Sequence, residues 1–204
     1  MSIYKLGLTG SIGMGKSTTA SMFREAGIPV FDSDAVVHQL YGPGGKAVPL
    51  IATAFPGSVE NGIVSRTKLS EMLASDSTGF DRLNSIVHPL VAECRHEFLK
   101  HAKREGEELV VFDIPLLFET GGEASVDGVL VVTAPADIQR DRVLARKGMT
   151  MARFEQILSR QTPDSEKRER ADFVIDTSGG ISEARKAVGA LIFKLKADPN
   201  QVSQ

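Results

Sequence analysis

The chain has 204 residues, of which 42% are hydrophobic, and its formal net charge at pH 7 is −2. This size and composition suit one sizeable domain or a core domain with an insertion, and the lack of a basic balance argues against a nucleic-acid partner. A single cysteine excludes a disulfide framework, no apolar run is long enough to span a membrane, and the first predicted strand leaves no room for a signal peptide, so we expect a cytoplasmic protein without a membrane partner.

The first stretch with a chemical meaning is residues 10–17, which read Gly-Ser-Ile-Gly-Met-Gly-Lys-Ser and match the phosphate-loop pattern G-x-x-x-x-G-K-S. A short apolar strand is predicted before it, at residues 3–9. An apolar stripe at helical spacing follows it and ends at Gly27, a predicted C-cap. A glycine-rich turn that matches by chance is the alternative, but strand, glycine loop and helix are the context in which this pattern binds phosphate.

The chemistry of this loop predicts a nucleotide site. Gly10, Gly13 and Gly15 allow the backbone to turn with positive φ and to approach an anion at a helix N-terminus, where the dipole favours phosphate. Lys16 adds a cation for the outer phosphates, and the Ser17 hydroxyl is a candidate ligand for Mg²⁺. The residues expected at the nucleotide are Ser11, Ile12, Gly13, Met14, Gly15, Lys16, Ser17 and Thr18.

Two carboxylates follow the second predicted strand, which covers residues 28–31. Asp32 and Asp34 come where an α/β sheet presents the carboxyl ends of its strands, and ligands bind at that edge. Either residue could instead cap a helix that starts near Ala35, because aspartate is a favoured N-cap residue. The sequence leaves both interpretations open.

Residues 35–106 show helical periodicity without a strand signal, which predicts a helical insertion over the sheet. Four short apolar stripes are followed by a longer helix that begins after His88, because Pro89 suits a first helical turn. His88 could contact a substrate or could be a structural residue at that helix start. Cys94 lies on the apolar stripe of the long helix and is expected in the core.

The third predicted strand covers residues 109–113 and ends in Asp113. This resembles the Walker B arrangement, in which an aspartate at the end of a strand holds Mg²⁺, usually through water. Residues 114–119 form an unusually apolar loop after it. Such a loop either packs under the insertion or lines a pocket.

Two further strands, at residues 129–132 and 173–176, flank a charged stretch rich in arginine. Its charges could be solvated helix faces, or the stretch could be a lid that brings arginines over a transferred phosphate. An amphipathic helix over residues 181–195 should cover the sheet. Strands that alternate with helices predict a doubly wound α/β fold with a five-stranded parallel sheet.

Several functional classes use a phosphate loop. A GTPase switch would carry N-K-x-D for guanine, which is absent, and a glycine three residues after Asp113, where Leu116 stands. A helical insertion and an arginine-rich stretch instead favour a small-molecule kinase. A nucleoside monophosphate kinase and a regulatory nucleotide-binding protein are the alternatives.

Further motifs occur in order along the chain, at residues 30–34, 65–69, 83–91, 113–119, 156–161 and 171–176. Together with residues 8–17 they resemble the motifs of the dephospho-CoA kinase family, and the resemblance covers nearly the whole chain. Ser11, Met14 and Thr177 stand where that family often has glycine, serine and asparagine. We interpret these three as mild departures at tolerant positions.

The resemblance implies ATP-dependent phosphorylation, with Mg²⁺, of the ribose 3′-hydroxyl of dephospho-CoA, the last step of CoA synthesis. It implies that Asp34 is the base or orienter of that hydroxyl, and that Asp32 is a secondary carboxylate. Lys16 and Arg142 become the catalytic cations, with Arg146 as a second arginine at the nucleotide. The implied substrate contacts are Asp32, Asp34, His88, Leu116 and Glu119, and the implied metal ligands are Ser17 and Asp113.

The resemblance also divides the chain into functional parts. The expected core comprises residues 1–34, 107–135 and 171–197, the substrate-binding insertion residues 35–106, and the lid residues 136–170. Dephospho-CoA is the expected small-molecule partner, and we expect a monomer.

Overall fold

The computed structural model describes residues 3–197. Its internal contacts divide the chain into two units. We call them the core unit, formed by the chain up to Phe31 and from Ala102 onward, and the inserted unit, Asp32–His101. Each has its own buried apolar cluster.

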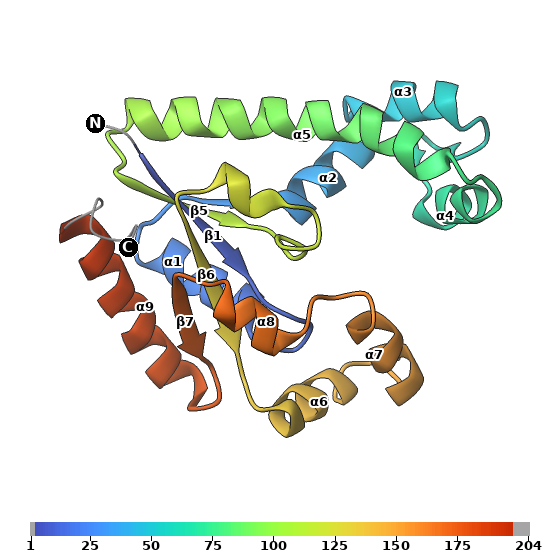
Figure 1. Cartoon of the computed structure of the whole chain (residues 1–204). Helices are drawn as coiled ribbons and strands as arrows, with labels where there is room; N and C mark the ends of the chain where they lie inside the picture. Colours follow the sequence, from blue (N-terminus) through green and yellow to red (C-terminus); the bar gives the residue numbers. More distant parts are fainter. Residues whose placement is uncertain (1–2, 198–204) are drawn as a thin grey trace. The chain divides into compact units, whose positions relative to one another are not determined.

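The core unit is built on a five-stranded parallel sheet (Figure 1). The strands are β1 (Tyr4–Thr9), β2 (Val30–Asp32), β5 (Leu109–Asp113), β6 (Gly128–Thr133) and β7 (Phe173–Asp176). Their order is β2-β5-β1-β6-β7, so that the strand of the phosphate-loop motif is central and pairs with both β5 and β6. The predicted α/β class and the parallel five-stranded sheet are confirmed.

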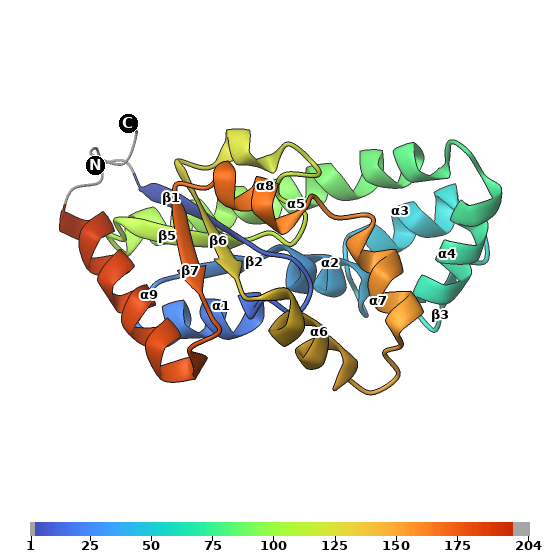
Figure 2. The ribbon, with the colours of Figure 1, turned by 60° about the horizontal axis from the view of Figure 1, so that its bottom comes forward.

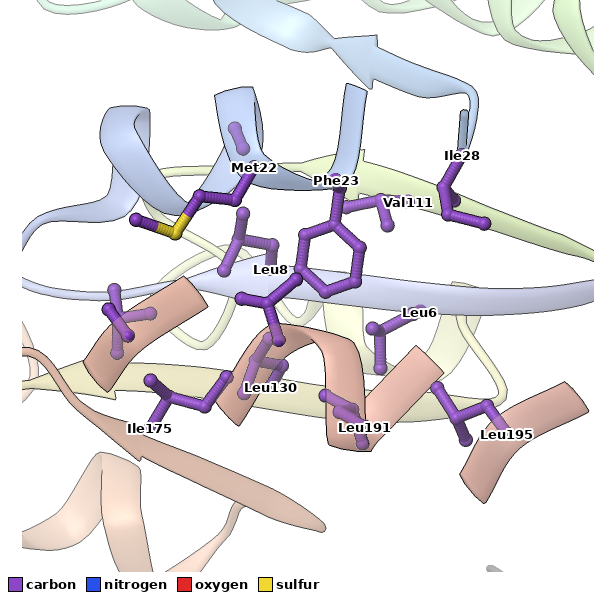
Figure 3. Close-up of a cluster of buried hydrophobic side chains, with 14 of the residues drawn as sticks. Leu6, Leu8, Met22, Phe23, Ile28, Val111, Leu130, Ile175, Leu191 and Leu195 are labelled. Atoms are coloured by element: carbon purple, nitrogen blue, oxygen red, sulfur yellow. The ribbon is translucent and has the colours of Figure 1, made fainter. Parts of the chain in front are cut away.

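Helices cover the sheet because its strands are apolar on both faces. On one face, Phe23 of α1 (Lys16–Glu25) and Leu191 of α9 (Gly180–Ala197) join Leu8 and Leu130 of the strands in one buried cluster (Figure 3). A second cluster, around Leu117 and its neighbours in the chain, lies against β6. The predicted C-terminal helix is confirmed.

The second strand begins two residues later than expected. Helix α1 ends in a Schellman motif, with Gly27 at φ 78°, its N–H bonded to Arg24 O (3.0 Å), and the Ile28 N–H bonded to Phe23 O (2.9 Å). Ile28 is therefore tied to the helix and cannot join the sheet. The helix ends where the sequence predicts, although the C-cap is Ala26 and Gly27 is the left-handed residue directly after it.

The inserted unit contains the helices α2 (Ser33–Tyr41), α3 (Ala47–Ala54), α4 (Arg66–Ser75) and most of α5 (Gly79–Arg104). It also contains a hairpin of β3 (Val59–Glu60) and β4 (Ile63–Val64), so the expectation of no strand in this stretch is wrong. The turn is Asn61-Gly62, with φ values of 51° and 75°. Asn-Gly is the dipeptide that two-residue hairpins favour, and this signal was present in the sequence.

The helix start expected at Pro89 is also absent. Pro89 lies inside α5, which is one continuous helix of 26 residues. Proline removes one helical hydrogen bond. The apolar residues before it, such as Leu83 and Val87, pack in the same cluster as Leu90 and Cys94 after it. A continuous helix buries both stripes at once, which outweighs the missing bond.

The charged stretch between β6 and β7 forms three helices, α6 (Ala136–Leu144), α7 (Met151–Leu158) and α8 (Asp164–Glu169). Figure 2 shows α6 and α7 leaving the end of β6, and α8 leading back to β7. A short 3₁₀ helix, η1 (Gly122–Ser125), precedes β6. Within residues 3–197, none of the helices has the length and apolar character needed to cross a bilayer.

Candidate active site

The phosphate loop follows β1 and leads directly into α1. Gly13 and Gly15 have φ values of 82° and 91°, as the motif predicts. The expectation for Gly10 is wrong, because its φ is not positive. A side chain there would instead meet Val132, whose Cγ2 and backbone oxygen lie 2.6 and 2.8 Å from the position of a Cβ atom. Gly10 is thus required by close packing against β6.

The structure brings two predicted site residues into direct contact at the carboxyl ends of neighbouring strands. Nζ of Lys16, the first residue of α1, lies 2.5 Å from Oδ1 of Asp113, the last residue of β5. The Asp113 side chain is 5% exposed and that of Lys16 17%. The ammonium group of Lys16, which is expected to bind phosphate oxygens, therefore lies beside Asp113, the carboxylate expected to hold the metal ion.

The donor set at this edge suits Mg²⁺. Asp113 offers a carboxylate, and Ser17, one residue beyond Lys16, is an exposed residue with a hydroxyl. Oxygen ligands are those that Mg²⁺ takes, and the ion usually keeps several waters and binds through one or two protein groups and substrate phosphates. No cluster of three or more acidic, histidine or cysteine side chains occurs among the described residues.

A pocket of about 260 Å³ opens beside the loop. It is lined by Gly13, Gly15, Thr18, Thr19, Met22, Arg142, Arg146, Thr177, Gly180, Ile181 and Ala184. Both predicted arginines therefore share one cavity with the phosphate loop, although more than 120 residues separate them from it in the sequence. The cavity has backbone, hydroxyl and guanidinium groups for phosphates, and apolar side chains at α1 and α9.

Thr177 fixes the position of Arg142. The guanidinium donates to Thr177 through Nη1 to Oγ1 and through Nη2 to the backbone oxygen, both at 2.8 Å. The Thr177 hydroxyl lies 3.0 Å from Met14 O, to which it can donate its single proton. Met14 in turn accepts the Ala134 N–H at its sulfur (3.1 Å). Thr177 and Met14 are 6% and 2% exposed, so both lie in buried positions where their side chains have specific partners.

In the inserted unit, Asp32 and Asp34 have different roles. Asp32 is the N-cap of α2 and accepts the Ala35 N–H at 2.9 Å, so the capping interpretation holds for Asp32 and fails for Asp34. Asp34 lies in the first turn and lines a pocket of about 370 Å³. The other lining residues are Val37, Tyr41, Arg66, Leu69, Ser70, Leu73 and Leu83. Within the described part of the chain, no hydrogen bond or ion pair engages the Asp34 carboxylate.

The remaining predicted substrate contacts lie in different surroundings. His88 is exposed in the middle of α5, so it does not mark a helix start. Leu116 is 42% exposed in the loop after β5. Glu119 accepts the Thr162 N–H (2.8 Å), and its Oε1 lies 2.9 Å from Nζ of the fully buried Lys167. Burial raises the pKa of Glu119, but hydrogen bonds from Lys167 and from backbone amides outweigh it and lower the pKa.

The sequence did not predict the contacts of several residues of this site. Thr177, Gln139 and Lys167 lie in or beside segments whose charges and hydroxyls look like ordinary surface. Their importance comes from contacts with residues more than 30 positions away, such as Arg142 with Thr177 and Lys167 with Glu119. Only the topology of the sheet brings these partners together.

A phosphate loop on the central strand, an acid at the end of the next strand and two arginines on one pocket define a P-loop kinase. Comparison with known proteins narrows this class. A family model described as dephospho-CoA kinase matches residues 4–183. The chain belongs to the dephospho-CoA kinase family and is an ATP-dependent kinase.

Individual relatives agree. A dephospho-CoA kinase of Rhizobium etli is 56% identical over 192 residues, which cover 94% of each chain. The crystal structure of TT1252 from Thermus thermophilus matches with a TM-score of 0.82 and 33% identity, over 96% of this chain and 99% of that one. A dephospho-CoA kinase from Campylobacter jejuni shares the fold, with a TM-score of 0.68 and 21% identity, over 94% and 96% of the two chains. The alternatives of a nucleoside monophosphate kinase and a regulatory protein are not favoured.

Proposed function

We propose that this chain transfers the γ-phosphoryl group of ATP to the ribose 3′-hydroxyl of dephospho-CoA and thereby produces CoA. The observation that carries the proposal is the meeting of Lys16 with Asp113 at the phosphate loop, beside a pocket that also holds Arg142. Phosphoryl transfer asks mainly for positioning and for stabilisation of charge on the phosphoryl oxygens. Family membership supports the acceptor.

In the core unit, the loop amides and Lys16 would hold the phosphates, and Arg142 and Arg146 would neutralise charge from the other side of the pocket. Mg²⁺ would be held by Ser17 and Asp113 and would supply further neutralisation of the phosphates. Residues 11–18 are the proposed nucleotide contacts. We assign residues 136–170, which carry both arginines, as the lid.

In the inserted unit, Asp34 would accept the proton of the ribose hydroxyl, and the apolar pocket beside it, with Arg66, suits a substrate that has both apolar and phosphate parts. We propose residues 35–106 as the substrate-binding insertion on the core of residues 1–34, 107–135 and 171–197. His88, Leu116 and Asp32 are proposed as further substrate-side residues. Glu119 is left out, because its carboxylate already has two protein partners.

We propose a monomer as the working form. We propose the cytoplasm as its location, because the reaction consumes ATP.

A coupled assay of ADP release tests the proposed function. Purified protein receives ATP and Mg²⁺ with dephospho-CoA, with a nucleoside monophosphate, or with no acceptor. Release that depends on dephospho-CoA supports the proposal. Turnover with monophosphates would indicate a nucleoside monophosphate kinase, and nucleotide binding without turnover would indicate a regulatory protein.

The variant Asp113→Asn is expected to raise the Mg²⁺ concentration for half-maximal activity by about tenfold, because a neutral amide holds the hydrated ion less well than a carboxylate. A Mg²⁺ titration at saturating ATP measures this. Asp127→Asn is the matched control, since it neutralises a carboxylate just before β6, at the opposite end of the strands. An unchanged midpoint for Asp113→Asn would show that Asp113 is not the metal anchor.

The variant Arg142→Ala is expected to lower kcat by about 100-fold and to change KM for dephospho-CoA much less, because a lid arginine acts on charge that develops in the transition state. Steady-state kinetics with each substrate varied measures the split. Arg146→Ala, in the same pocket, is the comparison and should lose less. A loss confined to KM of the acceptor would move Arg142 to the substrate side.

A further inference from the structure

Two side-chain amides of the proposed lid bind the backbone of Ile12 in the phosphate loop, one at its C=O and one at its N–H. Gln139 of α6 donates from Nε2 to the backbone oxygen of Ile12 at 2.7 Å. Gln161, between α7 and α8, accepts the Ile12 N–H at Oε1, at 3.1 Å. The orientation of each amide is fixed by its partner, because a backbone N–H can only donate and a carbonyl can only accept. Two separate parts of the proposed lid thus bind the same residue of the loop.

The hydrogen bond from Gln139 to Ile12 O determines the direction of the Gly13 N–H. In a planar trans peptide, the C=O of one residue and the N–H of the following one point in opposite directions. With its oxygen turned to Gln139, the Ile12–Gly13 peptide directs the Gly13 N–H away from that side chain. Gly13 is buried, and within residues 3–197 its N–H donates to no protein acceptor. A buried, unused N–H in a phosphate loop is available for an anion.

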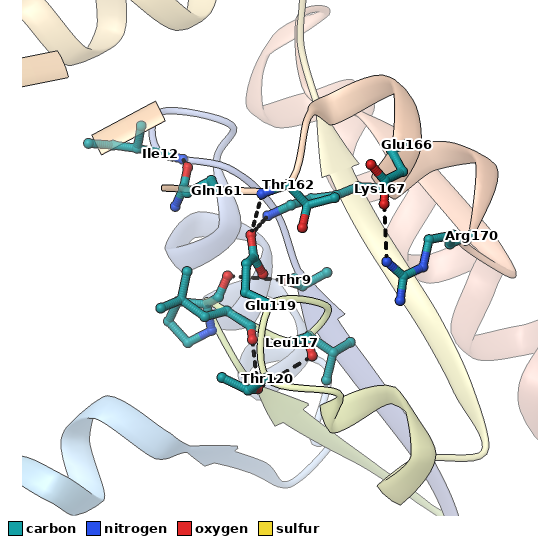
Figure 4. A network of polar contacts seen from close by, with 12 residues as sticks. Thr9, Ile12, Leu117, Glu119, Thr120, Gln161, Thr162, Glu166, Lys167 and Arg170 are labelled. Atoms are coloured by element: carbon teal, nitrogen blue, oxygen red, sulfur yellow. Dashed lines mark hydrogen bonds and ion pairs between the residues drawn. The ribbon is translucent and has the colours of Figure 1, made fainter. Parts of the chain in front are cut away.

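A buried ion pair holds Gln161 in place. Its neighbour Thr162 donates its N–H to Glu119 at 2.8 Å, and Glu119 also pairs with Lys167, whose side chain is 0% exposed. Figure 4 shows the sequence of contacts, with Glu119 between Thr162 and Lys167 and with Gln161 at Ile12. The loop that follows the Walker-type strand β5 is therefore connected, through Glu119, to the residue that holds the phosphate loop.

We infer that Gln139 and Gln161 are positioning residues, which hold the phosphate loop in its anion-binding conformation, and that Glu119 keeps Gln161 in register. This deepens the proposed function and rests on it, since the anion is taken to be the nucleotide phosphate. The lid would then act on the nucleotide in two ways, through the cations of α6 and through the shape of the loop itself.

The same substitution at the two glutamines gives opposite hydrogen-bond results, which makes a matched test. Glutamate at position 139 has no proton to donate to Ile12 O at neutral pH, whereas glutamate at position 161 still accepts from the Ile12 N–H. Both variants add one negative charge beside the same residue. We expect Gln139→Glu to bind MgADP about 10- to 100-fold more weakly than the wild type, and Gln161→Glu to lose markedly less.

Calorimetric titration with MgADP measures these affinities, and melting temperatures show that each variant is folded. Gln139 is 6% exposed, and burial raises the pKa of a carboxyl group. Lowering the pH from about 8 to about 5 should therefore protonate the carboxyl group introduced by Gln139→Glu, which can then donate to Ile12 O, and binding should recover relative to Gln161→Glu. A purely structural loss would not follow pH in this way. If Gln139→Glu does not fold, Gln139→Met, which removes the donor without adding charge, takes its place with the same expected loss.

The role of Glu119 is tested with two variants. Glu119→Ala removes the acceptor of the Thr162 N–H. The double variant Glu119→Gln/Lys167→Met keeps an acceptor and removes both charges of the ion pair. We expect Glu119→Ala to weaken MgADP binding about tenfold and the double variant to weaken it less.

Equal losses of MgADP affinity in Gln139→Glu and Gln161→Glu, at every pH, would overturn the inference. A wild-type chain that binds MgADP but does not phosphorylate dephospho-CoA would overturn the proposed acceptor alone, and one that binds no MgADP would overturn both proposals.

Discussion

Replacement of Lys16 with alanine is expected to lower kcat by about 100- to 1,000-fold. The ammonium group is the cation of the phosphate loop, and electrostatic stabilisation of a transferred group is commonly worth several kcal/mol. It lies 2.5 Å from Asp113, at the end of the neighbouring strand. Steady-state turnover with ATP and dephospho-CoA measures the effect.

The ion pair of Lys16 with Asp113 also means that Lys16→Ala should lower the stability of the protein. Removal of Lys16 takes an ammonium away from a carboxylate that is 5% exposed, which should cost about 1–3 kcal/mol of unfolding free energy. The double variant Lys16→Ala/Asp113→Asn separates the two effects, because the neutral amide no longer needs a cation. We expect its stability to recover and its activity to stay low. Near-normal kcat in a folded Lys16→Ala variant would contradict the role of Lys16 at the phosphates.

The variant Asp34→Asn is expected to lower kcat by about 10²- to 10⁴-fold with MgADP binding unchanged. An amide keeps the shape and one acceptor oxygen but cannot take the proton of a ribose hydroxyl, and general-base catalysis contributes a factor of this size. The fold should be little affected, since the cap of α2 is made by Asp32. Turnover and melting temperature are measured on the same preparation.

Asp32→Ala is the matched control for this variant. It removes the N-cap hydrogen bond to Ala35 and should lower stability by about 1 kcal/mol, which is more than Asp34→Asn loses. The contrary pattern, a fall in melting temperature and full turnover in Asp34→Asn, would remove Asp34 from the mechanism. The base would then have to be sought among other side chains of the inserted unit.

Local patterns were sufficient for the parts of the fold that rest on local physics. An apolar run before G-x-x-x-x-G-K-S predicted β1, the phosphate loop and α1, and a second apolar run that ends in Asp113 predicted β5. The contact of Lys16 with Asp113 follows from strand adjacency, which the sequence alone did not give. Even so, Lys16 and Asp113 were each predicted as site residues, because each has a characteristic position in its motif.

Where sequence reasoning failed, a competing physical effect explains the result. Proline usually ends a helix, yet Pro89 lies within α5, because residues on both sides of it share one apolar cluster. The Asn61-Gly62 turn was overlooked within a long helical pattern, although it has a clear local signature. The contacts of Gln139, Gln161 and Thr177 could not be predicted, because the partner of a polar side chain is known only once the fold brings the two together.

The central position of β1 has a consequence for synthesis on the ribosome. Its register with β5 joins Tyr4 to Leu109, and its other neighbour, β6, is translated later still. At about 5–20 residues per second, the apolar first strand therefore waits on the order of 5–20 s without a partner. The buried cluster of the inserted unit, from Leu40 to Val87, is complete before Leu109 is made. The middle of the chain can thus assemble first, whereas the first strand stays unpaired until the later strands emerge.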